Sequence, residues 1–167
     1  VGESGVIWFE DAGTIAFHNA PEQSRTVVND RGWVTFWDVG YLDEGGYLYL
    51  TDRKQFMIVS GGVNIYPQEI EDALVLHPAV ADVAVFGVPN DEFGEEVKAV
   101  VQPAPGWTAS DDLGSALIEY CRDRVAHYKC PRSVDFEAEL PRTDAGKLYK
   151  RLLRDRYWAE RGTSRLL

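Results

Sequence analysis

One lysine near the end of this 167-residue chain is placed to present a positive charge on a turn. Lys147 follows Asp144-Ala145-Gly146, and glycine permits a tight backbone turn that would expose the next side chain. An ammonium group held in a fixed position can stabilise negative charge that develops during a reaction. Taken alone, however, a lysine that precedes a helix is more often simply solvated.

Two further charged residues, Asp38 and Arg53, have types that suit the binding of a polar ligand. A carboxylate such as Asp38 can accept hydrogen bonds from two hydroxyl groups, although an aspartate in this place also commonly closes a strand into a turn. The ordinary explanation for Arg53 is a surface salt bridge, which contributes little to stability. The residues by themselves leave both alternatives open.

The sequence shows no nucleophilic or metal-binding pattern. Cys121 and Cys130 lie in neither a CxxC nor a Cys/His metal spacing, and two cysteines do not make a disulfide framework. This favours a reducing, cytoplasmic setting. His77 and His127 lack a triad partner or a second ligand at metal spacing, so we interpret them as structural and expect no metal.

The charge balance excludes some classes of function. The chain has 17 basic and 27 acidic residues, a formal net charge of −10, which argues against general nucleic-acid binding. No run approaches the ~20 apolar residues of a membrane span. We expect Glu95 and Glu96 to be solvated at a strand entrance. We also expect the basic residues near the end to face water on a last helix. They are Lys147, Lys150, Arg151, Arg154 and Arg156.

The pattern of apolar residues divides the chain in two. Residues 1–52 are predicted to be rich in β-structure and short of helix, with β-like runs at 6–9, 14–17 and 32–37 and a hairpin over 41–50. The chain does not begin with Met, which leaves truncation open, and no secretory signal is visible at its start.

From residue 56 onward, strands and helices alternate, which predicts an α/β (α+β) domain with a short mixed sheet flanked by helices. Helices are expected to begin at Pro67, after the Ser110 cap and at Lys147, and the first of them to end at Pro78. The predicted strands cover 56–59, 80–88, 97–101 and 134–136.

Five segments, in one order and spacing, resemble the adenylate-forming acyl-CoA synthetases, the AMP-binding acid–CoA ligase family. They are residues 32–43, 47–54, 127–131, Ser60-Gly61-Gly62-Val63-Asn64-Ile65-Tyr66-Pro67-Gln68-Glu69-Ile70-Glu71 and Leu140-Pro141-Arg142-Thr143-Asp144-Ala145-Gly146-Lys147. The resemblance implies the C-terminal part of a longer enzyme. Residues 1–52 would end its large N-terminal domain, 53–55 would be a hinge and 56–167 a small C-terminal lid domain.

The resemblance implies a two-step reaction. A carboxylic acid, possibly a fatty acid, reacts with MgATP to give an acyl-adenylate and pyrophosphate, and the thiol of coenzyme A then displaces AMP. Lys147 matches the catalytic lysine of the first step, and its charge would stabilise the transition state. Asp38 and Arg53 match the residues that contact the ribose of the adenylate.

The lid of this family alternates between two poses about the hinge, which serve the two half-reactions in turn. Gln55 stands at the hinge position. Gly61 and Gly62 match the loop that approaches the pantetheine of coenzyme A, although an ordinary tight turn would also explain them. Weaker candidates for the phosphates of coenzyme A are Arg122, Arg124 and Lys129.

Some family features are altered or missing. The chain has Thr35-Phe36-Trp37 where the family usually has Arg-Thr-Gly, and Phe56 replaces a usual Asp after the hinge. The phosphate loop, the acid pocket and the Mg-binding glutamate all belong to the N-terminal domain upstream. We therefore expect the chain to be inactive alone, with its own N-terminal domain as a partner.

Three alternatives remain open from the sequence. The same fold serves adenylation modules that deliver their acyl group to a carrier-protein thiol, and related luciferases oxidise their adenylate. The chain could also be a non-catalytic binding module. The presence together of Asp38, Arg53, Gly61, Gly62 and Lys147 argues against that last alternative.

Overall fold

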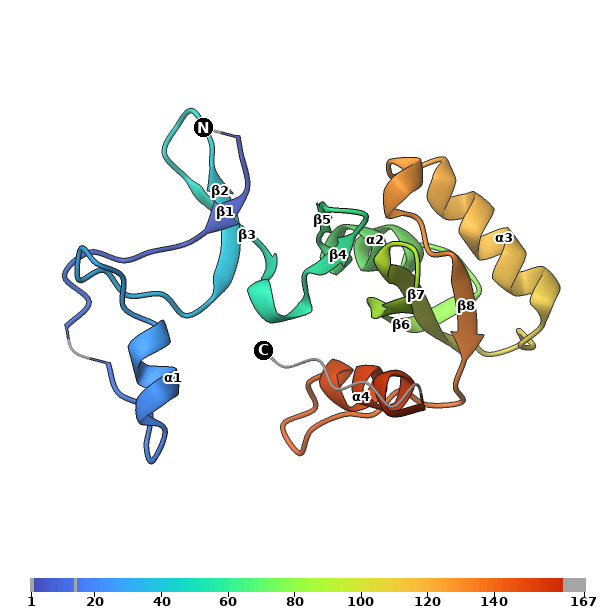
Figure 1. The fold of residues 1–167 in the computed structure, drawn as a ribbon. Coiled ribbons are helices and arrows are strands. Elements are labelled where there is room, and N and C mark those ends of the chain that lie inside the picture. The colour runs from blue at the N-terminus through green and yellow to red at the C-terminus, as the bar shows by residue number, and fades with distance from the viewer. Residues whose placement is uncertain (1, 14, 161–167) are drawn as a thin grey trace. The chain divides into compact units, whose positions relative to one another are not determined.

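The computed structural model describes residues 2–13 and 15–160 (Figure 1) and divides into two compact units between Gln55 and Phe56. We describe each unit by itself. The first holds a three-stranded antiparallel sheet in the order β1-β2-β3. Its elements are β1 (Gly5–Val6), α1 (Pro21–Thr26), β2 (Asp38–Leu42) and β3 (Leu48–Arg53).

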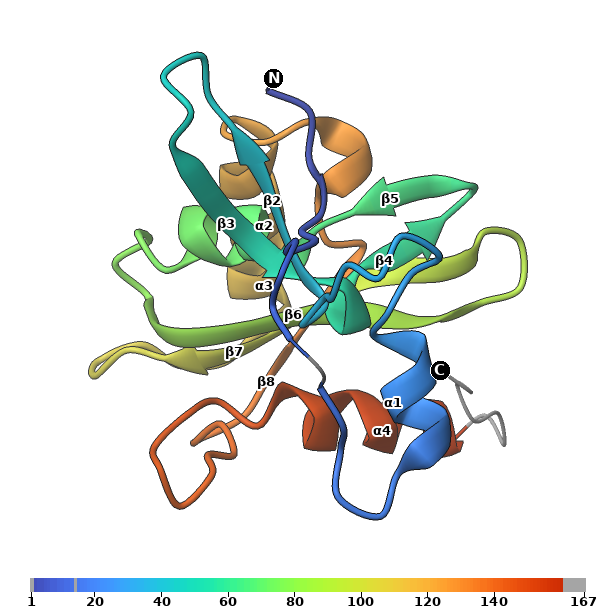
Figure 2. The same cartoon turned by 90° about the vertical axis from the view of Figure 1, so that its left-hand side faces the viewer.

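The predicted hairpin over residues 41–50 is confirmed as the β2–β3 pair (Figure 2). Its turn is closed by the carboxylate of Asp43, which accepts a hydrogen bond of 2.9 Å from the backbone N–H of Tyr47. Gly46 has a φ of +80°, a left-handed conformation that costs glycine little. The turn sets the register near it, with Tyr41 opposite Tyr49, and a shift of one residue between Val39 and Gly40 then places Asp38 opposite Arg53.

The first unit is short of helix, as predicted, but it holds one short helix that the sequence analysis does not mark, α1 over Pro21–Thr26. Proline starts it, and the hydroxyl of Ser24 ties it down by donating to the Ala20 carbonyl and accepting from the Phe17 N–H. The run 32–37 is also not a strand: Val34 makes only isolated bridges. Residue 14 lies outside the described residues, and 15–17 form no strand.

The second unit is built on a five-stranded mixed sheet, which confirms the predicted fold class. Strands β5-β4-β7-β6 are antiparallel neighbours, and β8 pairs with β7 in parallel. The elements are β4 (Ile58–Ser60), β5 (Val63–Ile65), α2 (Pro67–Leu74), β6 (Val80–Asn90), β7 (Gly94–Pro103), α3 (Asp111–Arg122), β8 (Ser133–Phe136) and α4 (Lys150–Glu160). Strand β5 was missed by the sequence prediction.

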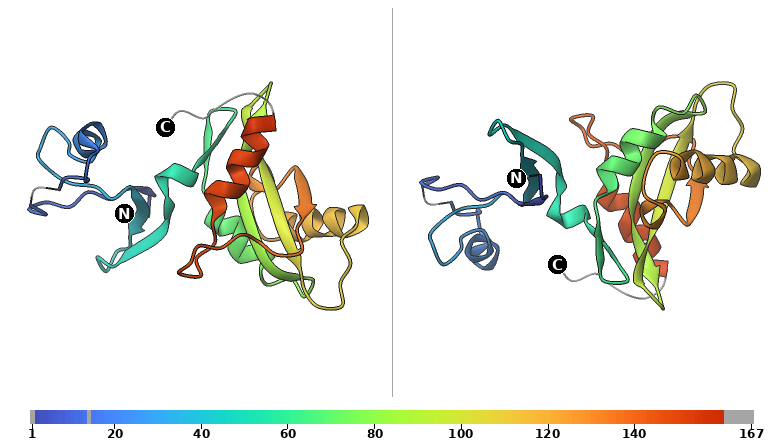
Figure 3. Two further views of the ribbon diagram at one scale, coloured as in Figure 1. Left: turned by 90° about the horizontal axis from the view of Figure 1, so that it is seen from below. Right: turned by 90° about the horizontal axis from the view of Figure 1, so that it is seen from above.

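Successive residues of β6 point to opposite faces of the sheet, and both faces are buried. Val83 and Val85 pack with α2 and α3, whereas Ala84 and Phe86 pack with Leu153 of α4. The two views of Figure 3 agree, since α4 lies in front of the sheet from below and α2 from above. The second unit is thus a sheet between two helical layers.

The helix starts follow the predicted signals. Pro67 begins α2, and the Ser110 hydroxyl accepts a hydrogen bond of 3.1 Å from the Leu113 N–H at the start of α3. Helix α2 ends at Leu74, before the predicted Pro78, and α4 begins at Lys150 rather than Lys147. None of the helices in the described ranges is long and apolar enough to span a bilayer.

Two predictions of solvation are wrong. Lys150 and Arg154 are buried, although the sequence predicts both on the solvent-exposed face of the last helix. Lys150 forms a 2.6 Å ion pair with Glu71 of α2, and the side chains are only 9% and 10% exposed. Glu95 is buried too, and its carboxylate accepts a hydrogen bond of 3.1 Å from the Val59 N–H in β4. Buried charges of this kind are tolerated only when they are paired.

The buried pair yields a prediction about stability. Lys150→Met should lower the free energy of unfolding by about 3 kcal/mol or more, because the Glu71 carboxylate would lose its buried cation. Chemical denaturation measures this loss. Arg151→Met is the matched control: its ion pair with Asp155 is exposed, so the change should stay within about 0.5 kcal/mol. Equal losses in the two variants would contradict a role for the buried pair.

Candidate functional site

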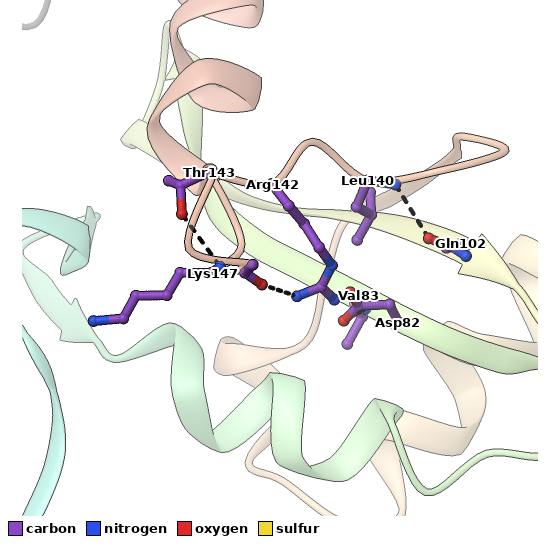
Figure 4. A network of polar contacts seen from close by, with 8 residues as sticks. Asp82, Val83, Gln102, Leu140, Arg142, Thr143 and Lys147 are labelled. Carbon is purple, nitrogen blue, oxygen red and sulfur yellow. Dashed lines mark hydrogen bonds and ion pairs between the residues drawn. The ribbon is translucent and has the colours of Figure 1, made fainter.

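Lys147 lies on an exposed turn between β8 and α4 (Figure 4). Arg142 and Leu148 pair across the base of this turn, and the Thr143 N–H donates to the Lys147 carbonyl over 2.8 Å. Gly146 has a φ of +76°, as the sequence suggested for a tight turn. The side chain of Lys147 points away from the Arg142 guanidinium in this view. The geometry therefore presents an ammonium group to a ligand approaching the unit.

Asp38 and Arg53 lie side by side in the first unit. They are cross-strand partners of β2 and β3, and Arg53 Nε lies 3.1 Å from Asp38 Oδ1. Both side chains keep some exposure, 59% for Arg53 and 25% for Asp38. A carboxylate next to a guanidinium offers an acceptor and a donor together, which suits a ligand with vicinal hydroxyls.

Trp37, directly before Asp38, has a strained backbone. Its φ is +63°, a left-handed conformation that glycine adopts freely and a tryptophan adopts only at a cost. Its ring compensates with contacts: Lys54 Nζ lies 4.2 Å from the ring centroid, and Trp8 packs edge-on at 6.3 Å. Glycine, which the resembling family usually has at this position, would adopt the same backbone conformation without strain.

Gly61 and Gly62 form the two-residue turn between β4 and β5. Their φ values are +56° and +80°, and positive φ at both central positions is what a tight type I′ hairpin needs. A side chain on Gly61 would press against the Phe93 ring, whereas Gly62 faces open space. The turn accounts for both glycines, so their role in binding pantetheine stays a prediction.

Gln55 lies in a single 3₁₀ turn, Lys54–Phe56, where the two units meet along the chain. Phe56, which replaces the usual acid, lies 5.1 Å from the buried Lys150 ammonium and contributes a cation–π contact. The hinge role of Gln55 stays a prediction.

Each of the three basic candidates for binding phosphates already contacts another side chain of the second unit. Arg122 pairs with Glu119 within α3, and Arg124 stacks on the Tyr120 ring 3.5 Å from its centroid. Lys129 forms a 2.5 Å ion pair with Glu69 across to α2. A phosphate would have to compete with these contacts, so their assignment is the weakest of the site.

The described residues give no sign of metal or thiol chemistry. Within 2–13 and 15–160, no three His, Cys, Asp or Glu side chains are grouped so as to hold a metal ion. Burial, reinforced by the neighbouring Cys130 thiol, raises the pKa of Cys121 to about 12. The ring of His77 packs edge-on against Tyr120, and its Nδ1 accepts a hydrogen bond of 3.1 Å from the Ala79 N–H, as a structural histidine would.

Sequence reasoning missed the charged residues that hold the Lys147 turn. Arg142 lies within the motif quoted above, and its position there was the only available signal. Its partner Asp82 lies 60 residues earlier, and nothing in the local sequence marks it. Glu71 and Lys150 were likewise unmarked as a pair.

Comparison with known proteins identifies the second unit. Residues 69–147 match the family model described as the AMP-binding enzyme C-terminal domain. These residues belong to that family. The match ends at Lys147, and the resemblance inferred from sequence motifs is confirmed. The match covers most of α2, the strands β6, β7 and β8, helix α3 and the exposed lysine turn, whereas β4, β5 and α4 lie outside it.

Relatives extend the likeness to most of the chain. It is 39% identical over 158 residues to the long-chain-fatty-acid–CoA ligase FadD13 of Mycobacterium tuberculosis, covering 95% of this chain and 30% of that protein. The chain therefore spans less than a third of this curated relative.

Solved structures agree. ATP-bound MatB from Rhodopseudomonas palustris matches with a TM-score of 0.81 and 32% identity, over 93% of this chain and 31% of that one. The o-succinylbenzoate CoA synthetase MenE from Bacillus subtilis, in complex with the acyl-adenylate intermediate OSB-AMP, matches with a TM-score of 0.75 and 34% identity, over 92% and 31%. The AMP-binding C-terminal domain and the preceding strands are thus found together in these enzymes.

The raised pKa of Cys121 predicts that its thiol is inert. At pH 8 only about one molecule in ten thousand would carry the thiolate, so iodoacetamide should label Cys121 only after unfolding in urea. Because the folded state holds this proton more tightly, its contribution to stability is lost as the pH rises from 9.0 to about 12. Mass spectrometry of labelled protein checks this, and rapid labelling of Cys121 in the folded state would contradict it.

The backbone of Trp37 yields a second prediction. Trp37→Ala and Trp37→Gly both remove the ring contacts, but only glycine relieves the left-handed strain. The glycine variant should therefore be more stable than the alanine variant by about 1 kcal/mol, measured by urea denaturation of the same protein. An alanine variant as stable as the glycine variant would show that residue 37 is unstrained.

Proposed function

We propose that the chain is the C-terminal part of an AMP-forming acid–CoA ligase and acts with an N-terminal domain of the same longer protein. The observation that carries this proposal is the exposed turn that presents Lys147 at the end of the matched AMP-binding domain. The chain spans about 30% of FadD13 and of MenE, which supports its being one part of such an enzyme.

In the first half-reaction, a carboxylic acid attacks the α-phosphate of ATP, and pyrophosphate leaves. Lys147 would place its ammonium where negative charge develops on the transferring phosphate and the attacking carboxylate. Asp38 and Arg53 would hold the ribose hydroxyls, since they already lie 3.1 Å apart as acceptor and donor. A Mg²⁺ ion would be held by the N-terminal domain, since no three His, Cys, Asp or Glu side chains among the described residues are grouped for a metal.

In the second half-reaction, the thiol of coenzyme A displaces AMP. We place the turn of Gly61 and Gly62 against the pantetheine arm, because a turn without side chains permits close approach. Gln55 would absorb the rotation between the two poses. Arg122, Arg124 and Lys129 are the weaker candidates for the phosphates of coenzyme A.

Coenzyme A is favoured over a carrier-protein thiol as the acceptor. FadD13 and MenE are both named for CoA ligation, and they differ in their acid: one is named for long-chain fatty acids and the other for o-succinylbenzoate. The acid class of this protein is therefore best found by experiment, with fatty acids included in the panel.

The function is tested in the longer protein by ATP–pyrophosphate exchange across short, long and aromatic acids. We expect exchange with one acid class, and Lys147→Ala should lower it about 100-fold or more, because an ammonium that stabilises the transition state is lost. Thioester formation from supplied acyl-adenylate should be spared.

Arg151→Ala is the matched control, since it removes an exposed positive charge close to Lys147 in sequence but outside the turn. It should leave both half-reactions intact. Equal loss of both half-reactions in Lys147→Ala would refute the assignment of Lys147. No exchange with any acid, in a folded protein that binds ATP, would favour a non-catalytic role.

A further inference from the structure

The turn that carries Lys147 closes on itself but needs an external attachment. The Gly146 N–H donates to the Thr143 carbonyl over 2.8 Å, and the Lys147 N–H donates to the Thr143 hydroxyl over 3.2 Å. These bonds fix the shape of the turn. All residues from Thr143 to Lys147 are exposed, so packing does not fix where the turn lies on the unit.

The two ends of the surrounding segment are held by the core. The Leu140 side chain is buried and its N–H donates to the Gln102 side chain over 3.1 Å. At the other end, Lys150 is buried against Glu71, which also accepts a 2.6 Å hydrogen bond from the Val85 N–H of β6. Between these two points, the exposed residues from Thr143 to Lys147 need a further contact to hold them against the unit.

Arg142 provides that attachment (Figure 4). Its Nη1 donates to the Gly146 carbonyl over 2.8 Å, and its Nη2 forms a short ion pair with Asp82 of β6. The Asp82 carboxylate is itself oriented, because its Oδ1 accepts a 2.9 Å hydrogen bond from the Val83 N–H. One planar guanidinium thus joins the carbonyl next to Lys147 to the central sheet.

Loss of this attachment should change the position of Lys147 more than it changes the stability of the domain. The Arg142 and Asp82 side chains are 46% and 22% exposed, and partly exposed ion pairs contribute little to the stability of a fold. A displacement of about 1 Å in a reacting group, by contrast, can lower a rate about 100-fold. Loss of the contact should therefore be detected in catalysis rather than in folding.

We propose that Arg142 is a positioning residue for Lys147, acting through its double contact with Asp82 and the Gly146 carbonyl. The proposal rests on the function proposed above, in which Lys147 serves adenylation.

The test uses the longer enzyme and compares the two half-reactions. Arg142→Ala should lower kcat for ATP–pyrophosphate exchange about ten- to a hundredfold while KM for ATP and for the acid changes little. Thioester formation from supplied acyl-adenylate should be unchanged. Arg142→Lys should restore activity only in part, because one ammonium does not match the two acceptors as a guanidinium fork does.

A matched control separates positioning from loss of a surface ion pair. Arg156 of α4 has a similar exposure of 51% and pairs at 3.1 Å with Glu137, a residue outside the turn. Arg156→Ala should leave exchange unchanged. If Arg142→Ala lowers the unfolding midpoint, the exchange assay is repeated with Asp82→Asn. This variant keeps the side-chain shape and removes only the charge that orients Arg142, so lowered exchange supports the proposal and normal exchange overturns it.

A double variant distinguishes action through Lys147 from a separate effect. If Arg142 acts by positioning Lys147, then adding Arg142→Ala to Lys147→Ala lowers exchange no further. A further loss equal to that of the single variant overturns the proposal, as does normal exchange in Arg142→Ala when Lys147→Ala is impaired. If Lys147→Ala itself leaves exchange intact, the proposed function fails, and the positioning role fails with it.

Discussion

Strand β6 anchors helices α2 and α4 and the exposed turn of the second unit. Its alternating side chains make two apolar faces, and each face has to be covered because neither can remain exposed to water. Its polar groups serve as anchors as well: the Val85 N–H binds Glu71, the Gly87 carbonyl accepts from the Trp158 indole, and Asp82 holds Arg142. One strand therefore positions α2, α4 and the exposed turn together.

Two lysines three residues apart show how environment assigns a role. Lys150 is buried against a carboxylate and the Phe56 ring, where its charge is fully engaged in holding α4 to α2. Lys147 is exposed on the turn just before that helix. Both side chains carry the same ammonium group, and their burial distinguishes the structural lysine from the candidate catalytic one.

Much of the fold could be predicted because its signals are local. Helices α2 and α3 follow from proline and serine at their starts, and β6 and β7 from long apolar runs. Helix α1 and strand β5 are short, so their periodicity is too weak to detect. For the site, the tight turn at Gly146 agrees with expectation, and the ion pair of Arg53 with Asp38 is the ordinary explanation that the sequence offered for Arg53. The contact of Arg142 with Asp82 could not be predicted, because it joins residues distant in sequence whose meeting depends on the folded sheet.

The hydrogen bonds and ion pairs described for the Lys147 turn all come from within the second unit, from Asp82, Gln102 and Glu71. The conformational entropy of ordering this backbone is therefore lost when the unit folds, not when it meets a substrate. The turn is therefore already ordered in the folded unit. Any rigid-body movement of the unit carries the ammonium group with it, and such a movement can deliver or withdraw this charge without refolding a loop.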